Sequence, residues 1–276
     1  MYCDLHTHSN CSDGTYTPTE LINLAKQENR ILALTDHNTV SGLPEFTVQA
    51  KQEGVTAVNG VELSAEYEGR ELHLIGLFLE EPYWSQVESW TDDIRAKKEQ
   101  SNRQMVDRLC ADRYEIDYDD LIDVNGKNIN RAHLAHALCR GGYVSSIQEA
   151  FNTLLGENHG YYIPPVRPSF LDAVSFLRQV RAVPAFAHPL KDMDEFSLCQ
   201  LLKLAIPAGL VGMEIYHSSY DAYQSKTAAE IANKYGLLPC GGSDFHGCRK
   251  PNVPFGIPEI PRKVYDDLLQ YKMSAF

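Results

Sequence analysis

Side chains that can bind metal recur at or near the ends of short apolar segments along this 276-residue chain. Nine of them stand out: His6, His8, Asp13, His37, Glu62, His73, His188, Asp244 and His246. Two pairs, at the two ends of the chain, are each separated by one residue, and in an extended backbone both members of such a pair point to the same side. Imidazole and carboxylate groups are ligands of Zn, Mn and Fe, and nine exceed what one ion binds. The pattern therefore predicts a multinuclear metal site assembled from the whole chain.

Outside residues 82–165, apolar strand-like segments alternate with segments of helical period. Strands are predicted over residues 2–5, 30–35, 56–61, 72–79, 183–187, 210–216 and 237–241. Helices are predicted over residues 19–28, 43–53, 170–180, 196–205 and 223–235. Alternation of this kind is typical of parallel strands. Polar residues gathered at the strand ends favour a (β/α) barrel with its site on that face. With about seven strands, residues 1–81 and 166–276 are expected to form an α/β fold, a distorted (β/α)7-type barrel.

Residues 82–165 have a different pattern, with no strand that ends at a candidate ligand. A long charged helix is predicted over 84–112, with shorter helices near 121, 131–140 and 147–155. We interpret this region as a helical insertion domain that acts as a substrate lid. It carries Arg131, whose planar guanidinium suits a phosphate group. The alternative is a solvated helix arginine.

Composition limits the function classes. The net charge of −12 argues against a broad nucleic-acid-binding surface, although an anionic substrate could still bind beside metal ions. The seven cysteines include no C-x-x-C pair, as expected for free thiols in a reducing compartment. Neither a membrane-spanning segment nor a signal-peptide pattern is found, so a cytoplasmic location is expected. The GxGxxG and GxxxxGK[ST] motifs are absent, which argues against nucleotide cofactors and P-loop chemistry.

Several of the candidate ligands could instead have ordinary structural roles. Asp13 alone would be a turn aspartate, and Glu62 could form a salt bridge at a strand end. Asp36, next to His37, is predicted to orient that imidazole. His217 also follows an apolar segment, and substrate contact and metal ligation are equally open for it.

The ordered motifs resemble the PHP (polymerase and histidinol phosphatase) superfamily of metal-dependent phosphoesterases over nearly the whole chain. They are residues 4–9, 12–14, 35–39, 60–62, His73, 187–189 and 243–246. The resemblance implies the PHP fold and two to three divalent metal ions, with Mn, Fe or Zn as candidates. It also implies three ligand sets, the first two of which share Glu62: His6, His8, Glu62 and Asp244; Glu62, His73 and His188; Asp13, His37 and His246.

The helical insertion looks like that of the bacterial nucleoside 3′,5′-bisphosphate phosphatases, some of which also trim RNA from the 5′ end. The resemblance implies a small phosphorylated substrate, a nucleotide or short RNA, with no membrane or obligate protein partner. Arg131 and His133 would bind the substrate. A Gly-Arg-Pro-His pattern of that branch is replaced here by Asn130, Arg131, Ala132 and His133, and a basic residue that follows it by His136. Phosphate or base selectivity could therefore differ.

The mechanism expected from these residues is metal-assisted hydrolysis of a phosphomonoester. Arg131 would hold a phosphate group, and His217 is the candidate general acid. Three alternatives remain open. Amidohydrolases also begin with His-x-His, but many use a bridging lysine at a strand end, and none is found here. The other two are a histidinol-phosphate-type phosphatase and a non-catalytic PHP module, although such modules usually lose ligands.

Overall fold

The computed structural model describes residues 1–125, 129, 131–156 and 159–276. The chain divides into two compact units. The first, here called the barrel unit, contains residues 1–92 and 168–276. The second, the helical unit, contains residues 93–167. The α/β fold class, with a distorted barrel and a helical insertion, is confirmed. The division at 81/82 and 165/166 and the lid role of the insertion remain predictions.

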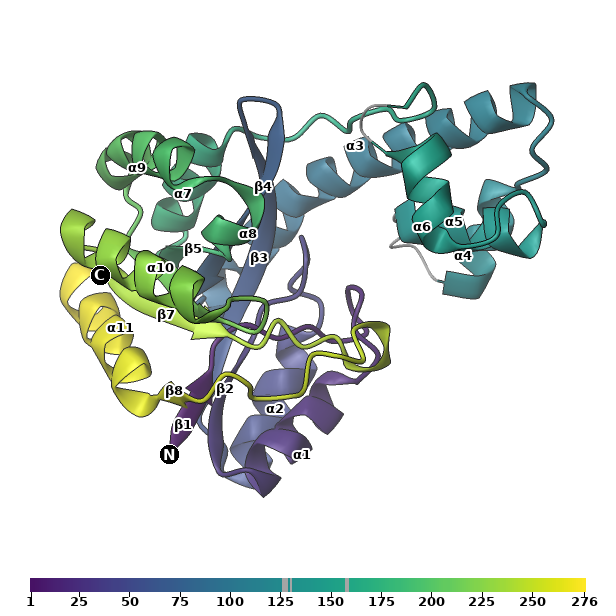
Figure 1. The fold of residues 1–276 in the computed structure, drawn as a ribbon. Helices are drawn as coiled ribbons and strands as arrows, with labels where there is room; N and C mark the ends of the chain where they lie inside the picture. Colours follow the sequence, from purple (N-terminus) through teal and green to yellow (C-terminus); the bar gives the residue numbers. More distant parts are fainter. Residues whose placement is uncertain (126–128, 130, 157–158) are drawn as a thin grey trace. The chain divides into compact units, whose positions relative to one another are not determined.

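Eight strands of the described chain form one sheet in the order β7-β6-β5-β4-β3-β2-β1-β8. They are β1 Tyr2–Asp4, β2 Arg30–Leu34, β3 Ala57–Tyr67, β4 Arg70–Leu77, β5 Val183–Phe186, β6 Gly212–His217, β7 Leu238–Gly242 and β8 Ile260–Pro261. The sheet curls until β1 approaches β7, where Leu5 N–H donates to the Gly241 carbonyl at 3.1 Å (Figure 1). The barrel is therefore nearly closed. The short strand β8, which pairs antiparallel with β1, was not predicted.

The main departure from the predicted fold is the direction of β4. A two-residue turn joins β3 to β4, and its residues Glu68 and Gly69 have φ angles of 50° and 77°. Successive positive φ angles are typical of a tight hairpin turn. β4 therefore runs antiparallel to both β3 and β5, so the expected parallel direction is wrong for this strand. The expected strand end before Glu62 is also wrong, because β3 continues along β4 to Tyr67.

Several helices of the barrel unit begin at a residue whose side chain caps the helix. For example, the side chain of Thr17 accepts from the Glu20 N–H, and the Glu20 carboxylate accepts from the Thr17 N–H, which together cap α1. The helices are α1 Pro18–Gln27, α2 Leu43–Glu53, α7 Phe170–Gln179, α8 Pro189–Asp192, α9 Glu195–Ala208, α10 Ala222–Tyr235 and α11 Arg262–Ala275. The helices α8 and α11 were not predicted.

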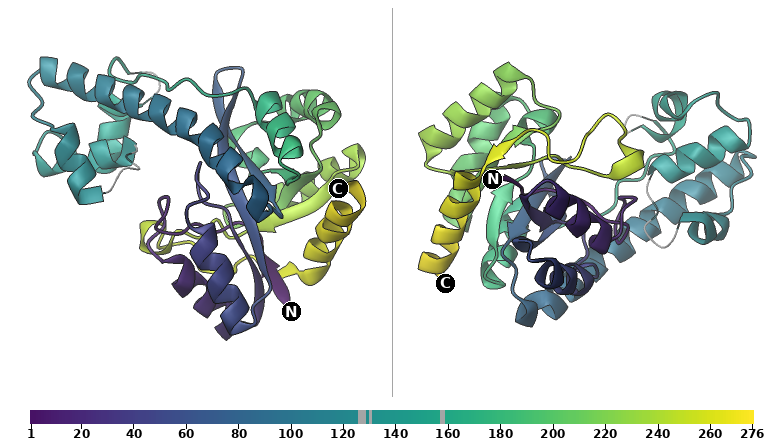
Figure 2. Two further views of the ribbon diagram at one scale, coloured as in Figure 1. Left: turned by 180° about the vertical axis from the view of Figure 1, so that it is seen from behind. Right: turned by 90° about the horizontal axis from the view of Figure 1, so that it is seen from below.

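Two apolar clusters stabilise the barrel unit. One packs α1, α2, α7, α9 and α10 against the sheet, with Phe46 and Phe170 fully buried within it. The other joins strand residues such as Ile31 and Ala185 to Leu268 of α11, which contacts β1 and β7 (Figure 2). These clusters hold the strands that carry the candidate ligands.

The helical unit has an apolar core of its own, built around Leu109, Leu134 and Leu138. The helical unit contains most of α3 (Trp84–Ala111). It also contains α4 Tyr118–Asn125, α5 Arg131–Arg140, α6 Ile147–Ala150 and a π-helical turn over Phe151–Leu155. Within the described residues, no helix of the chain is both long and apolar enough to cross a membrane. All seven cysteines, each in the described part of the chain, are free thiols.

Candidate metal centre

The first and last candidate pairs are brought together by backbone hydrogen bonds. Asp244 N–H donates to the His6 carbonyl at 2.9 Å, and His8 N–H donates to the Phe245 carbonyl at 3.0 Å. His6 and His8 are fully buried on the extended segment that continues β1. The extended backbone predicted for the second pair is wrong, because Asp244 has a φ of 57°. Its side chain nonetheless reaches His8, whose Nε2 lies 3.3 Å from Asp244 Oδ1.

Glu62 lies at the centre of the cluster and is fully buried. Five imidazole nitrogens lie within 3.3 Å of its two carboxylate oxygens: His37 Nδ1, His6 Nε2 and His8 Nε2 face Oε2, and His73 Nδ1 and His188 Nε2 face Oε1. Burial raises the pKa of this carboxyl, but the imidazoles, His37 first, bring it well below its usual range. The carboxylate is therefore ionised, with each oxygen directed at a different group of imidazoles.

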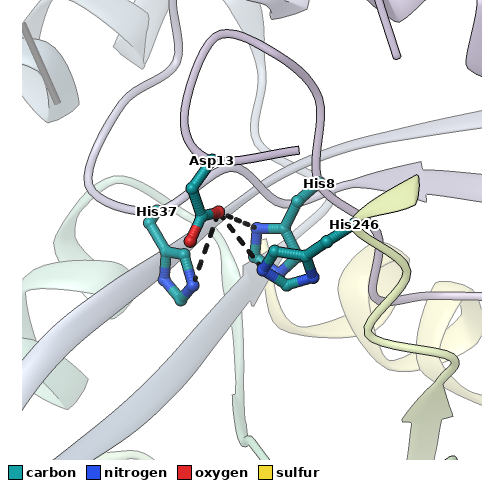
Figure 3. A group of neighbouring side chains, drawn as sticks. All are labelled: His8, Asp13, His37 and His246. Atoms are coloured by element: carbon teal, nitrogen blue, oxygen red, sulfur yellow. Dashed lines mark ion pairs between the residues drawn. The ribbon is translucent and has the colours of Figure 1, made fainter. Parts of the chain in front are cut away.

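Asp13 organises a second part of the centre, nearer the surface. Its Oδ1 lies 3.2 Å from His246 Nε2 and 4.0 Å from both His8 Nδ1 and His37 Nε2. Figure 3 shows these three imidazoles directed at the one carboxylate. Burial lowers the pKa of His8, as do the neighbouring His246 and His37. His8 is thus held neutral, which is the form of imidazole that binds metal.

Four groups of side chains are close enough to hold a metal ion in the described chain. They are His8, Asp13, His37 and His246; His6, His8 and Asp244; His37, Glu62 and His73; and His6, Glu214 and His217. Eight of the nine residues predicted from the sequence occur in these groups. The ninth, His188, joins the cluster through its contact with Glu62. The structure therefore gathers all nine predicted side chains in one place.

The unsatisfied atoms of the cluster match a bound cation. His8 Nδ1, Glu62 Oε2 and His73 Nδ1 are buried and make no hydrogen bond. A buried polar atom without a partner costs about 1–3 kcal/mol, and far more when it is charged. Divalent cations offset this cost, and the mixture of imidazole and carboxylate donors suits Mn, Fe and Zn. The residues present therefore fit the metal ions expected from the sequence.

Two carboxylates that were not predicted form hydrogen bonds with candidate histidine ligands, on the side of each ring that faces away from the cluster. Glu214 Oε1 lies 3.0 Å from His6 Nδ1, and Asp192 Oδ2 lies 2.7 Å from His188 Nδ1. A carboxylate accepts hydrogen bonds, so each Nδ1 carries the proton and each Nε2 presents its lone pair to the cluster. Glu214 also accepts from the His188 N–H at 2.6 Å. A glutamate in the otherwise apolar segment of β6 was the available signal for it.

His217 has the opposite arrangement. The Ser219 backbone N–H donates to His217 Nδ1 at 3.1 Å, and the Ser219 hydroxyl lies 2.7 Å from the same atom. An Nδ1 that accepts leaves the hydrogen of the neutral ring on Nε2. That Nε2 lies 3.6 Å from Asp244 Oδ2. His217 therefore presents a donor toward the centre, where His6 and His188 present acceptors.

Asp36 does not orient His37, in contrast to the prediction. Its carboxylate accepts from the Ser9 N–H at 2.8 Å and from the Ser9 and Ser12 hydroxyls. It thereby shapes the loop that leads to Asp13. Asp4 binds Ser243 in the same manner, through that residue's N–H at 2.9 Å and hydroxyl at 2.6 Å. Asp36 thus fixes the loop that follows the first candidate pair, and Asp4 fixes the segment that precedes the second pair.

The predicted substrate-binding residues lie in the helical unit. Arg131 begins α5, and its guanidinium lies over the Tyr162 ring at 4.5 Å, with Nη1 3.5 Å from the Leu155 carbonyl. His133 is buried in the same helix. Asn130, the first residue of the predicted motif, lies outside the described residues. The role of Arg131 and His133 in binding substrate remains a prediction.

The family model of the PHP domain matches residues 4–163. The chain is 30% identical over 273 residues to a 3′,5′-nucleoside bisphosphate phosphatase from Chromobacterium violaceum, covering 96% of this chain and 95% of the relative. It is 31% identical over 268 residues to a phosphoribosyl 1,2-cyclic phosphate 1,2-diphosphodiesterase from Eggerthella lenta, covering 94% and 100%. It is 29% identical over 245 residues to a 5′-3′ exoribonuclease from Haemophilus influenzae, covering 88% and 89%.

Solved structures resemble the chain over nearly its whole length. A structure from Chromobacterium violaceum, named as an amidohydrolase with bound sulfate and no metal, has a TM-score of 0.83 and 29% identity and covers 98% of this chain and 96% of its own. A structure from Bifidobacterium adolescentis, proposed to be a metal-dependent phosphoesterase, has a TM-score of 0.82 and 27% identity, with coverage of 97% and 95%.

Proposed function

The chain belongs to the PHP domain family and is a metal-dependent phosphoesterase, and we propose that its substrates are phosphate esters of nucleotides, with nucleoside 3′,5′-bisphosphates preferred. The observation that carries this proposal is the cluster of imidazoles around the buried carboxylate of Glu62. Such a centre suits hydrolysis of an anionic ester, because bound metal ions offset the negative charge of the phosphoryl group.

The choice of substrate is supported by what the relatives have in common. Nucleoside 3′,5′-bisphosphates carry two phosphate groups on one ribose, and phosphoribosyl 1,2-cyclic phosphate also carries two. In RNA, each internal ribose is likewise bonded to phosphate on both sides. We therefore propose a ribose with two phosphate groups as the general substrate, with removal of nucleotides from the 5′ end of short RNA as a second activity. The main alternative substrate is a cyclic phosphodiester such as phosphoribosyl 1,2-cyclic phosphate.

For the metal ions, we propose two to three divalent ions per chain, drawn from Mn, Fe and Zn. Two of the three proposed ligand sets share Glu62, whose two oxygens face different imidazoles. They are His6, His8, Glu62 and Asp244; Glu62, His73 and His188; and Asp13, His37 and His246. When bound, the ions lower the pKa of a water molecule and so supply hydroxide near neutral pH.

The protein's own side chains would orient these ligands and stabilise the leaving oxygen. Glu214 and Asp192 hold His6 and His188 with Nε2 toward the centre. We propose that His217 Nε2–H donates a hydrogen bond to the leaving oxygen and stabilises its developing charge, because Ser219 holds the ring as a donor at the edge of the cluster. The general-acid role expected from the sequence would require an imidazolium with a hydrogen on Nδ1 as well, so we propose that water supplies the proton. The alternative, ligation through His217 Nε2, would require the hydrogen on Nδ1, where the Ser219 N–H already donates.

We propose that Arg131 binds the second phosphate of the substrate, together with His133 of the same helix. A guanidinium is a planar bidentate donor, and the Arg131 guanidinium lies over the Tyr162 ring at 4.5 Å. The insertion over residues 82–165 would then be the lid that reads the substrate. We further propose a cytoplasmic location, which the free thiols support, and no obligate protein partner.

Two measurements on the full chain test the proposal. Elemental analysis after reconstitution with Mn or Zn should find two to three ions per chain, and a value that stays below one would exclude the multinuclear centre. The metal-loaded protein should then be assayed against adenosine 3′,5′-bisphosphate, AMP, phosphoribosyl 1,2-cyclic phosphate, 5′-phosphorylated RNA and histidinol phosphate. The bisphosphate should give the highest kcat/KM. A higher value for the cyclic ester or for histidinol phosphate would contradict the proposed substrate.

A further inference from the structure

A lysine that the sequence analysis did not single out is bonded to a candidate metal ligand. Lys250 Nζ lies 2.7 Å from Asp244 Oδ2. The Lys250 side chain is 36% exposed, whereas that of Asp244 is only 6% exposed. The ammonium group therefore lies between the buried ligands and the solvent.

The two oxygens of Asp244 have different surroundings. Oδ1 faces imidazoles, with His8 Nε2 at 3.3 Å and His246 Nδ1 at 3.4 Å. Oδ2 faces Lys250 and His217 Nε2, the latter at 3.6 Å. The carboxylate thus separates the imidazole cluster from a cation and a hydrogen-bond donor. An anion that binds at the cluster beside Asp244 would meet both of these groups.

The backbone around Lys250 is fixed by neighbouring loops. Cys248 N–H donates to the Thr15 hydroxyl at 3.0 Å, and Lys250 N–H donates to the Gly247 carbonyl at 3.2 Å. Gly247 has a φ of 64°, and a β-carbon there would lie 2.1 Å from Thr15 Oγ1. The lysine therefore follows a turn that only glycine fits, packed against the loop that carries Asp13. This limits the positions that the side chain can reach.

Other lysines of the barrel unit pair with carboxylates on the surface of helices. Lys226 pairs with Glu230 at 3.7 Å, and Lys263 donates to Asp267 at 2.7 Å, in both cases one helical turn apart. Such exposed ion pairs contribute little to the stability of the fold. Lys250 differs because its partner belongs to the metal centre. An ammonium has three donors, and Asp244 accepts from one of them.

We propose that Lys250 binds a phosphoryl oxygen of the substrate at the metal centre and positions that group for hydrolysis. The inference rests on the proposed function, since it assigns a phosphate-binding residue to the same site. A lysine acts as a compact point charge for phosphate and donates charge-assisted hydrogen bonds to it. His217, on the other side of Asp244 Oδ2, would then face the leaving oxygen of the same phosphate ester.

Binding of inorganic phosphate to the manganese-loaded protein, measured by isothermal titration calorimetry, tests this role without turnover. In Lys250→Met, loss of a charge-assisted contact should weaken phosphate binding by about ten- to a hundredfold. Lys250→Arg, which keeps the charge, should retain more of the affinity. The matched control is Lys226→Met, which should bind phosphate as the wild type does. Elemental analysis and the thermal midpoint of each variant should show unchanged metal content and folding.

Two outcomes would overturn the proposal. Unchanged phosphate affinity in Lys250→Met with full metal content would mean that Lys250 only neutralises Asp244. Loss of metal in both Lys250 variants would make it a support for that ligand instead. A further assay separates this inference from the proposed function. If phosphate affinity falls as expected but the wild type hydrolyses none of the esters tested, the proposed function is wrong and the phosphate-binding role of Lys250 stands.

Discussion

The barrel unit and the helical unit bury different kinds of side chains. In the barrel unit, His6, Glu62 and Glu214 are fully buried among other ionisable groups. In the described part of the helical unit, the buried polar side chains are Ser101, Asn102 and His133, and Asn102 donates to the Ile129 carbonyl at 2.9 Å. Burial of charge is costly without compensation. The barrel interior therefore depends on its own partner groups and on cations, whereas the helical unit is stabilised mainly by apolar packing.

This difference predicts that substitutions in the two units will have different effects. A change in the barrel interior should alter metal content and turnover. A change in the helical core should alter stability and leave the metal centre intact. Four substitutions test the comparison, ordered by their expected effect on the centre.

The largest effect is expected for Glu62→Gln. The substitution keeps the size of the side chain but removes the charge that five imidazoles face. The value of kcat should fall by more than about a hundredfold, with loss of bound metal, as for other groups that position a metal. Steady-state kinetics and elemental analysis of the same preparation provide the check. Near-normal turnover at full metal occupancy would reduce Glu62 to a salt-bridge residue.

Glu214→Gln should have the next largest effect. The amide can still contact His6 and the His188 N–H, but it lacks the charge that holds the proton on His6 Nδ1. Metal affinity should fall by about ten- to a hundredfold, as is typical when a group that orients a ligand is changed. Competition with a metal-binding dye measures the affinity. Asp172→Asn at the exposed cap of α7 is the control, and equal affinities for all three proteins would contradict an orienting role for Glu214.

Arg131→Ala tests whether the helical unit contributes to catalysis at all. If Arg131 binds a second phosphate, kcat/KM for the bisphosphate should fall by about ten- to a hundredfold. Turnover of p-nitrophenyl phosphate, which has no second phosphate, should change much less. Equal losses on both substrates would place Arg131 at the scissile phosphate. No loss on either would leave it as a structural arginine stacked on Tyr162.

The smallest effect on the metal centre is expected for Leu109→Ala. Leu109 is fully buried in the core of the helical unit. Its truncation should destabilise that unit by about 2–5 kcal/mol, the usual cost of such a cavity. Denaturant unfolding followed beside metal analysis is the measurement. Unchanged metal content would support the conclusion that the metal centre does not depend on the stability of the helical unit. Loss of metal together with stability would contradict it.

Much of this fold follows from local sequence patterns. The alternation of apolar segments and helical segments predicts the barrel strands closely, and helix starts such as that of α1 follow from capping residues. The antiparallel direction of β4 was missed because it depends on positive φ angles at Glu68 and Gly69. A Glu-Gly pair is a weak turn signal, since glutamate seldom adopts a positive φ. The C-terminal helix α11 was also not predicted.

The sequence by itself indicated nine of the side chains that gather at the centre, because most of them lie at or near the ends of apolar segments that the core must bury. Only the tertiary structure decided how those side chains are supported. His6 and Glu214 are 208 residues apart and form a buried pair, and Lys250 reaches Asp244 only because the intervening turn packs against Thr15. Periodicity and capping act over a few residues. Which nitrogen of an imidazole faces the centre depends on the partner that accepts from the other nitrogen, and packing of distant strands brings that partner into place.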